Sequence, residues 1–387
     1  MKEENKIKSN KSVSKISVFI VLAILAVIIS ARYLTDEEFR NFVNINILRK
    51  EVVESTLNTI EIDSETNPYV YAYDKYITVL SKNKLKEYTS DGNLEAELDM
   101  NISVPLVSSN GKYMAIAEKS GKRIYLVSGS NILWNSEIEG SISSVRVNEN
   151  GYVSIVIKDT TYKSVVAFYD LSGTELFRTY LSTSYVVCTD ISPNNKYLAI
   201  GEVDYSGTVI KSCVKIISVE NAQKDPDNSI VYTYESDNGA IITNINYQNK
   251  DFAVCMFNNY IQKITLDSNE RLYDITANDL FVDINMKDSI AIVDKQSSGL
   301  FSYEYEIVIK KTDSKIENLY ILDSDLPKTI KISGENIALN LGNEVQIVGS
   351  NGWLIKKYTS SKQINSLVIG DSIAGVVYKN IIEIVEI

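Results

Sequence analysis

Hydrophobic and polar positions divide the chain into one long apolar run near the N-terminus and a longer region of short, strand-like segments. Residues 16–34 read ISVFIVLAILAVIISARYL and contain no charge before Arg32. At about 1.5 Å per residue in a helix, this run spans roughly 28 Å, close to the hydrocarbon thickness of a bilayer. The pattern predicts a transmembrane helix with Tyr33 at the membrane interface.

The flanks of this run predict its orientation. Residues 1–15 hold five lysines against two glutamates, a surplus of +3, whereas Asp36, Glu37 and Glu38 follow the run closely. Because positive flanks stay in the cytoplasm, we expect a basic cytoplasmic tail at 1–15 and an extracytoplasmic C-terminal domain. A cleaved signal peptide is the alternative, but no small-x-small site is well placed after the run and no lipobox cysteine is present. The sequence favours an uncleaved, single-pass signal anchor in the cell membrane.

Residues 35–58 predict a short helical stalk outside the membrane. Thr35 and Glu38 form a Thr-x-x-Glu capping box, a pattern that opens a helix. Asn44 and Asn46 interrupt any sustained heptad, so a structural stalk is favoured over a partner-binding coiled coil. Loosely spaced apolar residues give the stalk its amphipathic character: Phe39, Phe42, Val43, Val52, Val53 and Leu57.

From Tyr69 onward, short runs rich in Val, Ile, Tyr and Thr replace the helical period, and one polar turn that opens a hydrophobic strand recurs. The residues that open those strands are Tyr76, Tyr113, Tyr152, Tyr197, Phe252, Ser289, Asn336 and Ser372. Their spacings are 37, 39, 45, 55, 37, 47 and 36 residues. A period of about 40 residues is typical of a β-propeller with four strands per blade.

A second tight turn recurs in phase with the first. It lies in SDGNLEAEL (90–98), GSNILWNSEI (129–138), LSGTELFRTYL (171–181), DSNERLYDI (267–275) and SNGWLIKKY (350–358). Two alternating turns predict an all-β domain of four-stranded antiparallel blades over residues 59–387. The last repeat, at 364–387, supplies three strands, and residues 56–62 are the natural donor of the fourth. Eight turns then mean eight blades; seven blades with an irregular first unit is the alternative.

Several of these turns carry a family resemblance. SPNNKYLAIG (192–201) and SNGKYMAIA (109–117) resemble the strand-opening turns of WD40-like and TolB-like propellers. LSGTELF and SNILW resemble the Gly-x-x-Trp-type turns of quinoprotein-like propellers. The layout also resembles an uncharacterised family of Gram-positive bacterial membrane proteins with a basic tail, one anchor and a quinoprotein-like propeller. The resemblance implies the fold and no activity. Only two tryptophans are present, Trp134 and Trp353, so no pyrroloquinoline quinone site is expected.

Composition removes several kinds of chemistry. The chain has no histidine, which excludes Ser-His-Asp and Cys-His catalysis and His-ligated zinc. Cys188, Cys213 and Cys255 form no CxxC pair and are expected to be buried small hydrophobes. Asp225 and Asp227 lack the central glycine and closing glutamate of a calcium loop. A net charge of −11 argues against nucleic acid as a partner. We therefore predict no catalytic, metal-binding or cofactor-binding residues.

Two connections between second and third strands are long, 202–212 and 294–306, and open on the face of the interblade connections. Long loops on a rigid scaffold often carry binding residues. Both combine acidic residues with tyrosine, which buries a large area at low entropic cost. The candidate partner-binding residues are Asp204, Tyr205, Asp294, Tyr303, Glu304 and Tyr305. Ordinary variation of solvated loops is the alternative interpretation.

These patterns predict a non-enzymatic binding or scaffolding propeller that an anchored stalk presents to an envelope partner, either a surface protein or a wall polymer. The alternative is a carboxylate-dependent hydrolase acting on wall glycan or peptide, because paired carboxylates can cleave glycosidic bonds. A third hypothesis is an assembly factor that captures a partner strand at an open blade edge.

Overall fold

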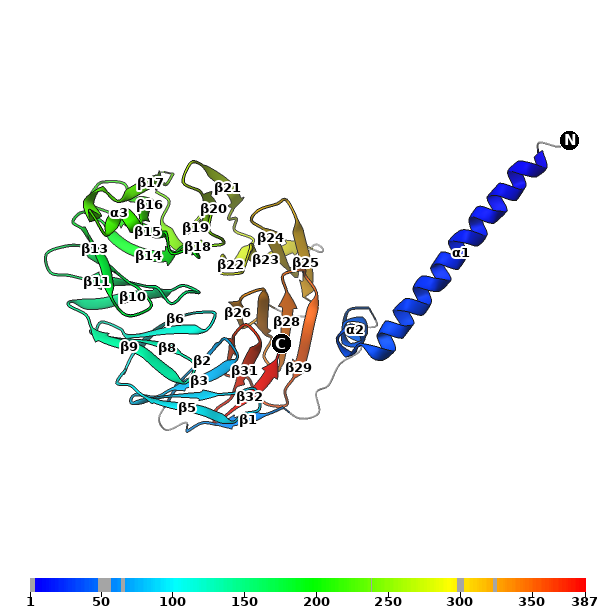
Figure 1. Ribbon diagram of the computed structural model, residues 1–387, viewed down its shortest axis with the longest axis horizontal. Helices are drawn as coiled ribbons and strands as arrows, with labels where there is room; N and C mark the ends of the chain where they lie inside the picture. The colour runs from blue at the N-terminus through cyan, green and yellow to red at the C-terminus, as the bar shows by residue number, and fades with distance from the viewer. Residues whose placement is uncertain (1–3, 48–56, 64–66, 238, 298–302, 323–325) are drawn as a thin grey trace.

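Eight four-stranded antiparallel sheets stand around a common axis as the blades of a propeller (Figure 1). The computed structural model describes residues 4–47, 57–63, 67–237, 239–297, 303–322 and 326–387. The predicted all-β, eight-bladed propeller is confirmed, and the seven-bladed alternative is excluded. The blades are numbered 1 to 8 along the chain.

Each blade begins with an inner strand at the central axis, and a second strand pairs with it on the side toward the rim. The inner strands are β2 (Tyr69–Tyr73), β6 (Pro105–Asn110), β10 (Ser141–Val147), β14 (Tyr185–Ile191), β18 (Ile242–Tyr247), β22 (Asp279–Asp283), β26 (Thr329–Ser333) and β30 (Ser366–Ile369). The second strands are β3 (Tyr76–Leu80), β7 (Tyr113–Glu118), β11 (Val153–Lys158), β15 (Tyr197–Asp204), β19 (Ala253–Phe257), β23 (Ser289–Ser297), β27 (Asn336–Asn340) and β31 (Ile373–Val377).

The remaining two strands complete each blade toward the rim. The third strands are β4 (Lys84–Tyr88), β8 (Arg123–Ser128), β12 (Ser164–Tyr169), β16 (Lys211–Ser218), β20 (Tyr260–Ile264), β24 (Tyr303–Lys311), β28 (Glu344–Gly349) and β32 (Ile381–Glu386). The outer strands are β5 (Leu94–Asp99), β9 (Asn131–Glu137), β13 (Glu175–Leu181), β17 (Ile230–Glu235), β21 (Asn269–Asp274), β25 (Glu317–Leu322), β29 (Leu354–Thr359) and β1 (Thr59–Glu61). Between β16 and β17 lie a helical turn, α3 (Val219–Ala222), and a 3-10 turn, η2 (Pro226–Asn228).

The recurring polar turn joins the inner to the second strand in each blade. Five of the eight predicted strand-opening residues begin the second strand, and Tyr152, Phe252 and Ser372 lie one residue before it. The backbone at Asp74 has φ 51°, and the corresponding Gly111 has the same value. Short polar residues and glycine tolerate this left-handed conformation, which explains the polar turn between two apolar strands.

The hydrophobic core is divided among the spaces between blades. One buried cluster fills each of the eight interfaces, including the one between blade 8 and blade 1. Cys188 and Cys255 are buried in the cluster between blades 4 and 5, as predicted. Cys213, which was also expected to be buried, is partly exposed, and its thiol donates to Glu202 Oε1 at 2.8 Å. A single meander cannot bury both of its faces, so each blade depends on two neighbours and the ring must close.

The N-terminal strand closes the ring. β1 pairs antiparallel with β32, and Ile60 lies opposite Ile382. Ile60 is buried in the cluster between blades 8 and 1. The donor predicted for the last blade is therefore confirmed for residues 59–61, and in the described part of the chain blade 8 has no missing strand for a partner to replace.

The long helix α1 (Glu4–Thr35) projects from the rim of the propeller (Figure 1). Its segment Val18–Thr35 has a mean hydropathy of 2.4 and is not buried, so it is long and apolar enough to cross a membrane. After Thr35 the chain forms a short helix, α2 (Glu37–Phe42), and a π-helical turn, η1 (Val43–Ile47). The rest of the predicted stalk, including Val52 and Val53, lies outside the described residues.

The helix cap at the start of α2 differs from the predicted one. Asp36 is the N-cap, and its Oδ1 accepts a hydrogen bond from the Phe39 backbone N–H at 3.0 Å. Thr35 ends α1, and its hydroxyl donates to the Ala31 carbonyl at 2.9 Å. The prediction that Thr35 caps the helix was wrong because a carboxylate one residue later competes for the same position, and aspartate is the better cap.

Candidate functional site

The inner strands surround a polar cavity of about 760 Å³ at the centre of the ring. Its walls come from the ends of inner strands and the turns that follow them, so it opens on the face opposite the connections between second and third strands. Most lining side chains are Asn, Ser, Asp, Glu or Gln. The volume lies within the range of small-molecule sites, and the lining suits a polar ligand.

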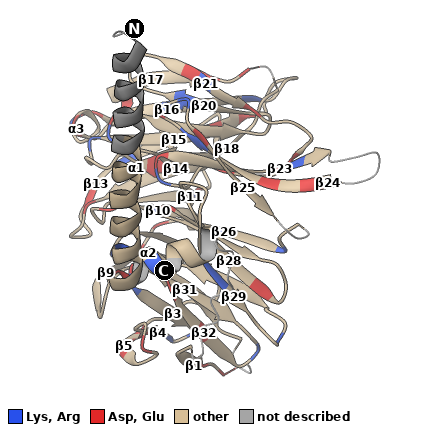
Figure 2. Cartoon of the chain, turned by 90° about the vertical axis from the view of Figure 1, so that its right-hand side faces the viewer, with Lys and Arg blue, Asp and Glu red and all other residues tan. Residues whose placement is uncertain are grey.

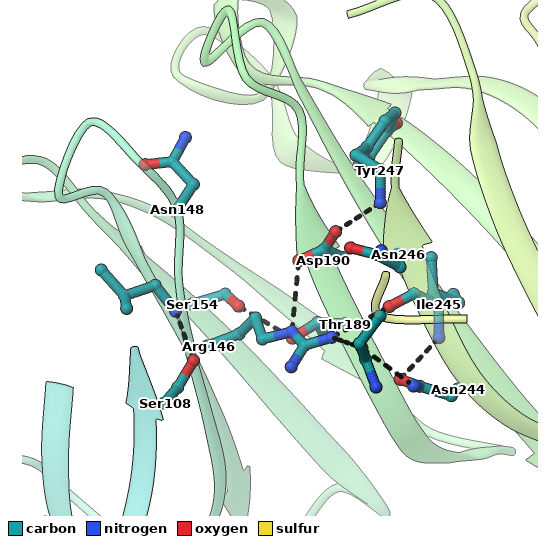
Figure 3. Close-up of polar contacts among 12 residues, drawn as sticks. Ser108, Arg146, Asn148, Ser154, Thr189, Asp190, Asn244, Ile245, Asn246 and Tyr247 are labelled. Carbon is teal, nitrogen blue, oxygen red and sulfur yellow. Dashed lines mark hydrogen bonds and ion pairs between the residues drawn. The ribbon is translucent and has the colours of Figure 1, made fainter. Parts of the chain in front are cut away.

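Arg146, near the end of β10, connects four blades across this cavity (Figure 3). Its Nε donates to Asp190 Oδ1 of blade 4 at 3.2 Å. Its Nη2 donates to the Ile245 carbonyl of blade 5 at 3.2 Å and to Asn285 Oδ1 in blade 6 at 3.3 Å. The planar guanidinium presents several donors in fixed directions, so one side chain holds these inner strands at set distances.

Asp190 is the buried anion of this network. The residue is 7% exposed, and its second carboxylate oxygen accepts a 2.5 Å hydrogen bond from the Tyr247 backbone N–H. Burial raises the pKa of Asp190, while the Arg146 charge and the hydrogen bonds oppose that rise. Both oxygens therefore have structural partners, and the carboxylate serves to fix blades 3, 4 and 5 together.

Side-chain amides complete the cavity wall on blades 5 and 6. Asn246 and Gln248 both donate to the Ile284 carbonyl, at 2.7 and 2.8 Å. Asn285 donates to Asp283 Oδ1 from its backbone and its side chain, and burial raises the pKa of Asp283. These bonds satisfy backbone groups that the ladder of an inner strand would leave open, and they hold the wall in one arrangement.

The cavity carries a surplus of negative charge. Five carboxylates and two cationic side chains line it, a balance of −3. Lys287 lies 3.6 Å from Glu335 at the mouth, which leaves three further carboxylates around the opening. These are Asp74, Glu149 and Asp371. The field at the mouth therefore favours cationic or hydrogen-bond-donating ligands.

The first predicted binding segment lies on blade 4, on the other face. Asp204 ends β15 and accepts a hydrogen bond from the Ser206 backbone N–H at 2.8 Å. Tyr205 is exposed and stacks on Tyr185, with ring centroids 5.0 Å apart. Lys163 of blade 3 lies 5.2 Å from the Tyr185 ring, so this part of the surface combines stacked tyrosines with one cation.

The second predicted binding segment is a hairpin rather than a long loop. β23 and β24 extend beyond their neighbours (Figure 2), and Asp294, Tyr303 and Tyr305 lie within these strands. The expectation of a loop over 294–306 was wrong because Tyr305 packs against the core between blades 6 and 7, which prolongs the strand pairing. Tyr303 is exposed, and Lys295 Nζ lies 3.6 Å from its ring.

The structure does not bring the two predicted segments together. Glu304 pairs in register with Gln296 on the hairpin of blade 6, whereas Asp204 and Tyr205 belong to blade 4. Blade 5 stands between them (Figure 1). The six residues therefore form two separate surfaces, and their role in partner binding stays a prediction.

Sequence reasoning missed the cavity residues. Arg146, Asp190, Asn246 and Asn285 each lie a few residues before a predicted strand-opening residue. A polar residue recurring at this phase, at or just after the end of each of these inner strands, was the available signal. Among the described residues, no group of three or more Cys, Asp or Glu side chains could hold a metal ion.

Comparison with known proteins gives a family and several similar solved structures. BamB from Moraxella catarrhalis is similar at 10% identity and a TM-score of 0.49, over 86% of this chain and 99% of that chain. The Cps50 (Swd1) propeller domain of Myceliophteria thermophila matches at 10% identity and a TM-score of 0.47, over 76% and 98%. Hydrazine synthase of Kuenenia stuttgartiensis matches at 9% identity and a TM-score of 0.44, over 87% and 99%.

These likenesses carry no argument about activity, and no curated protein matches the sequence. The sequence profile of a family of unknown function (DUF5711) matches residues 49–387. The match covers well over half of the chain, which therefore belongs to that family.

Proposed function

We propose that this chain is a membrane-anchored binding and scaffolding module outside the cytoplasm, not an enzyme. Its propeller receives a polar, net-cationic segment of an envelope partner in the central cavity. The observation that carries the proposal is the Arg146 network, because it fixes four inner strands around a preformed polar cavity. Preformed sites bind with less ordering cost than flexible ones.

The charge of the cavity supports a cationic segment. The balance of −3 at the lining and the three carboxylates at the mouth attract positive side chains. Asp190 is already committed to Arg146 and Tyr247, so the attraction comes from the mouth residues. Because those carboxylates are at the entrance, they act on the approach of a partner and on its orientation.

The placement outside the cytoplasm rests on the N-terminal region. Basic residues precede the apolar helix and acidic residues follow it, which favours a cytoplasmic N-terminus. The apolar segment Val18–Thr35 supports anchoring. Protease added to spheroplasts should degrade the propeller while the cells' cytoplasmic proteins stay intact; an untouched propeller would contradict this orientation.

Partner binding is tested by cross-linking in intact cells. A photo-reactive amino acid at Asn110, which is exposed at the cavity, should give discrete adducts. The same amino acid at Asp267, exposed on the rim of blade 5, is the matched control and should give none. Reversing the mouth charge with Glu149→Lys and Asp371→Lys should reduce the adducts about tenfold. Adducts that are equal at both positions would contradict the proposal.

A turnover assay distinguishes the hydrolase alternative from the binding proposal. The purified chain, incubated with cell-wall fragments, should retain its ligand without releasing products. Release of soluble glycan or peptide that depends on a carboxylate of the propeller would replace the binding proposal with the hydrolase.

A further inference from the structure

The segment that follows the apolar helix folds back beside the end of that helix. We call this segment together with the last turn of α1, residues 32–47, the collar. Tyr33 Oη donates to Asn44 Oδ1 at 2.8 Å, so the π-helical turn η1 lies at the level of Tyr33. Arg32 Nε donates to Asp36 Oδ2 at 3.1 Å, and the Arg32 guanidinium lies 5.0 Å from the Phe39 ring. The collar is therefore held at the end of the apolar helix.

The collar also contacts the rim of the propeller. The ring of Phe42 lies 5.2 Å from the ring of Trp353, with an interplanar angle of 58°. Trp353 directly precedes β29, the outer strand of blade 7. Figure 1 shows α2 beside β29. The collar therefore links the end of the apolar helix to the rim of blade 7. One link is the hydrogen bond between Tyr33 and Asn44, and the other is the ring contact between Phe42 and Trp353.

Exposed apolar side chains gather at this part of the rim. We call them the rim patch: Ile316 (58% exposed), Leu319 (56%), Ile321 (60%), Trp353 (44%) and Ile355 (39%). The two outer strands meet here, because Asn318 Nδ2 donates to the Ser350 carbonyl at 2.9 Å. The rim patch is therefore continuous with the Phe42–Trp353 contact.

The outer strand of blade 1, β5, is an example of a rim strand whose exposed side chains suit water. Alternate exposed positions of β5 are Glu95, Glu97 and Asp99. The corresponding exposed positions of β25 include Leu319 and Ile321. The two outer strands therefore differ in the polarity of their exposed side chains. Contiguous exposed apolar residues, as on β25, indicate contact with an apolar environment.

The sequence segment that contains the rim patch is more basic than the chain as a whole, although some of its charges, such as Glu335, lie at the cavity. Residues 310–362 contain eight lysines and six acidic residues, a surplus of +2, in a chain whose net charge is −11. Lys315, next to Ile316, is exposed, and Lys362 is exposed beyond the end of β29. Lysines beside apolar residues favour an anionic lipid surface.

We propose that the rim patch rests on the bilayer that holds the anchor, with Trp353, Leu319 and Ile321 in the boundary between headgroups and acyl chains of an anionic membrane. Tryptophan is enriched at that depth because its ring is apolar and its N–H is polar. The ring then stands with blades 6 and 7 against the membrane. This inference rests on the proposed membrane anchoring and adds the orientation of the propeller.

The two tryptophans provide the test. Trp134→Phe leaves Trp353 as the emitter, and Trp353→Phe leaves Trp134, which is 9% exposed within blade 2. Each full-length variant is reconstituted in phosphatidylglycerol–phosphatidylcholine vesicles with brominated acyl chains. Bromine quenches only nearby fluorophores, so Trp353 should lose about half or more of its emission. Trp134 should keep its emission, because its blade lies away from the collar.

Charged substitutions separate docking of the patch from simple tethering. In the Trp134→Phe background, Leu319→Glu with Ile321→Glu should restore most of the Trp353 emission. Leu133→Glu, at an exposed apolar residue of β9, is the matched control and should change nothing. In vesicles of phosphatidylcholine alone, quenching should be weaker, because the lysines lose their anionic partners.

The outcomes distinguish the two levels of the proposal. If the chain does not float with the vesicles, the anchoring itself fails. If the chain floats but Trp353 is no more quenched than Trp134, anchoring stands and membrane docking is overturned. Trp353 that is shielded from aqueous iodide without bromine quenching would show that a protein, such as a second copy of this chain, covers the rim patch, and this would also overturn the proposal.

Discussion

Arg146 and Asp190 form a 3.2 Å ion pair between neighbouring inner strands at the centre of the ring. The carboxylate is buried, and the arginine side chain is 29% exposed. Removing one member of such a pair leaves the other without its charge partner, whereas removing both does not. The same ion pair therefore shapes the cavity wall and stabilises the ring, so a substitution that breaks it should affect both.

We expect Arg146→Met to lower the free energy of unfolding by about 2–4 kcal/mol. The double variant Arg146→Met/Asp190→Asn should recover a large part of that loss, because no buried charge remains unpaired. Chemical denaturation of the four proteins of the cycle gives the coupling energy. Additive losses in the two single variants would show that the pair does not hold the blades together.

Closure of the ring by β1 gives a second prediction. Ile60 is 2% exposed, in the cluster between blades 8 and 1. Ile60→Ala should cost about 2–5 kcal/mol of unfolding free energy, because it leaves a cavity in the closing interface. Thr59→Ala, at an exposed neighbour on the same strand, should cost much less. Hydrogen exchange of the Ile384 amide, which donates to the Asn58 carbonyl at 2.9 Å, should speed up only in Ile60→Ala.

The buried carboxyl of Glu87 gives a pH dependence. Burial raises its pKa from about 4.5 to about 7, while a hydrogen bond from the Tyr73 hydroxyl opposes the rise. The folded state thus holds a proton that the unfolded state has released between pH 4.5 and 7, so stability falls as pH rises through this window. The Glu87 carboxyl contributes about 3 kcal/mol to this fall in the free energy of unfolding.

Glu87→Gln should remove that contribution, and its unfolding free energy should depend less on pH between 4.5 and about 7. The exposed Glu139→Gln variant is the control and should keep the slope of the unsubstituted protein. Denaturation at several pH values gives both slopes. Equal slopes for Glu87→Gln and the unsubstituted protein would show that the Glu87 carboxyl titrates alike in the folded and unfolded states.

Cys188 and Cys255 should react only on unfolding. Burial raises the pKa of Cys188 to about 12 and that of Cys255 well above its usual value. Since the thiolate is the reactive form, alkylation of the native protein at pH 8 should be slow and should follow global opening. Mass spectrometry of native and denatured samples measures the difference. Rapid modification of Cys255 in the native protein would contradict its place in the core.

The exposed residues predicted from the sequence should affect binding and not stability. Tyr303→Ala and Tyr205→Ala remove side chains that are 55% and 57% exposed. Each should change the unfolding free energy by about 0.5 kcal/mol or less. If the segments bind a partner, the same variants should weaken cross-linking to it in cells. Tyr180→Ala, at an exposed tyrosine of β13, is the control.

The fold was predictable because its turns repeat. Tyr76, Tyr113 and Tyr197 open second strands at the predicted positions, since the left-handed turn before each strand requires short polar residues or glycine. The closing role of residues 59–61 was also predictable, because the last repeat lacked one strand. Blade number therefore followed from local signals that recur at one period.

The cavity was less predictable because its residues are far apart in the sequence. Arg146 and Asn285 meet across the ring, 139 positions apart, and no local pattern gives that distance. Loop length was misleading for Asp294 and Tyr305, where packing against the core extended the strands. Tertiary contacts decided these cases, and a single sequence does not contain them as a local signal.

The pairing of β1 with β32 also sets the order in which the molecule can be completed. The strand that carries Ile60 leaves the ribosome early, whereas its partner around Ile382 is among the last segments synthesised. Until then both ends of the incomplete circle are open edges that could pair with other chains. Completion of synthesis and final folding are therefore coupled in time: the ring closes only after its last strand has been made, and interrupted synthesis leaves an open ring whose first strand has no partner.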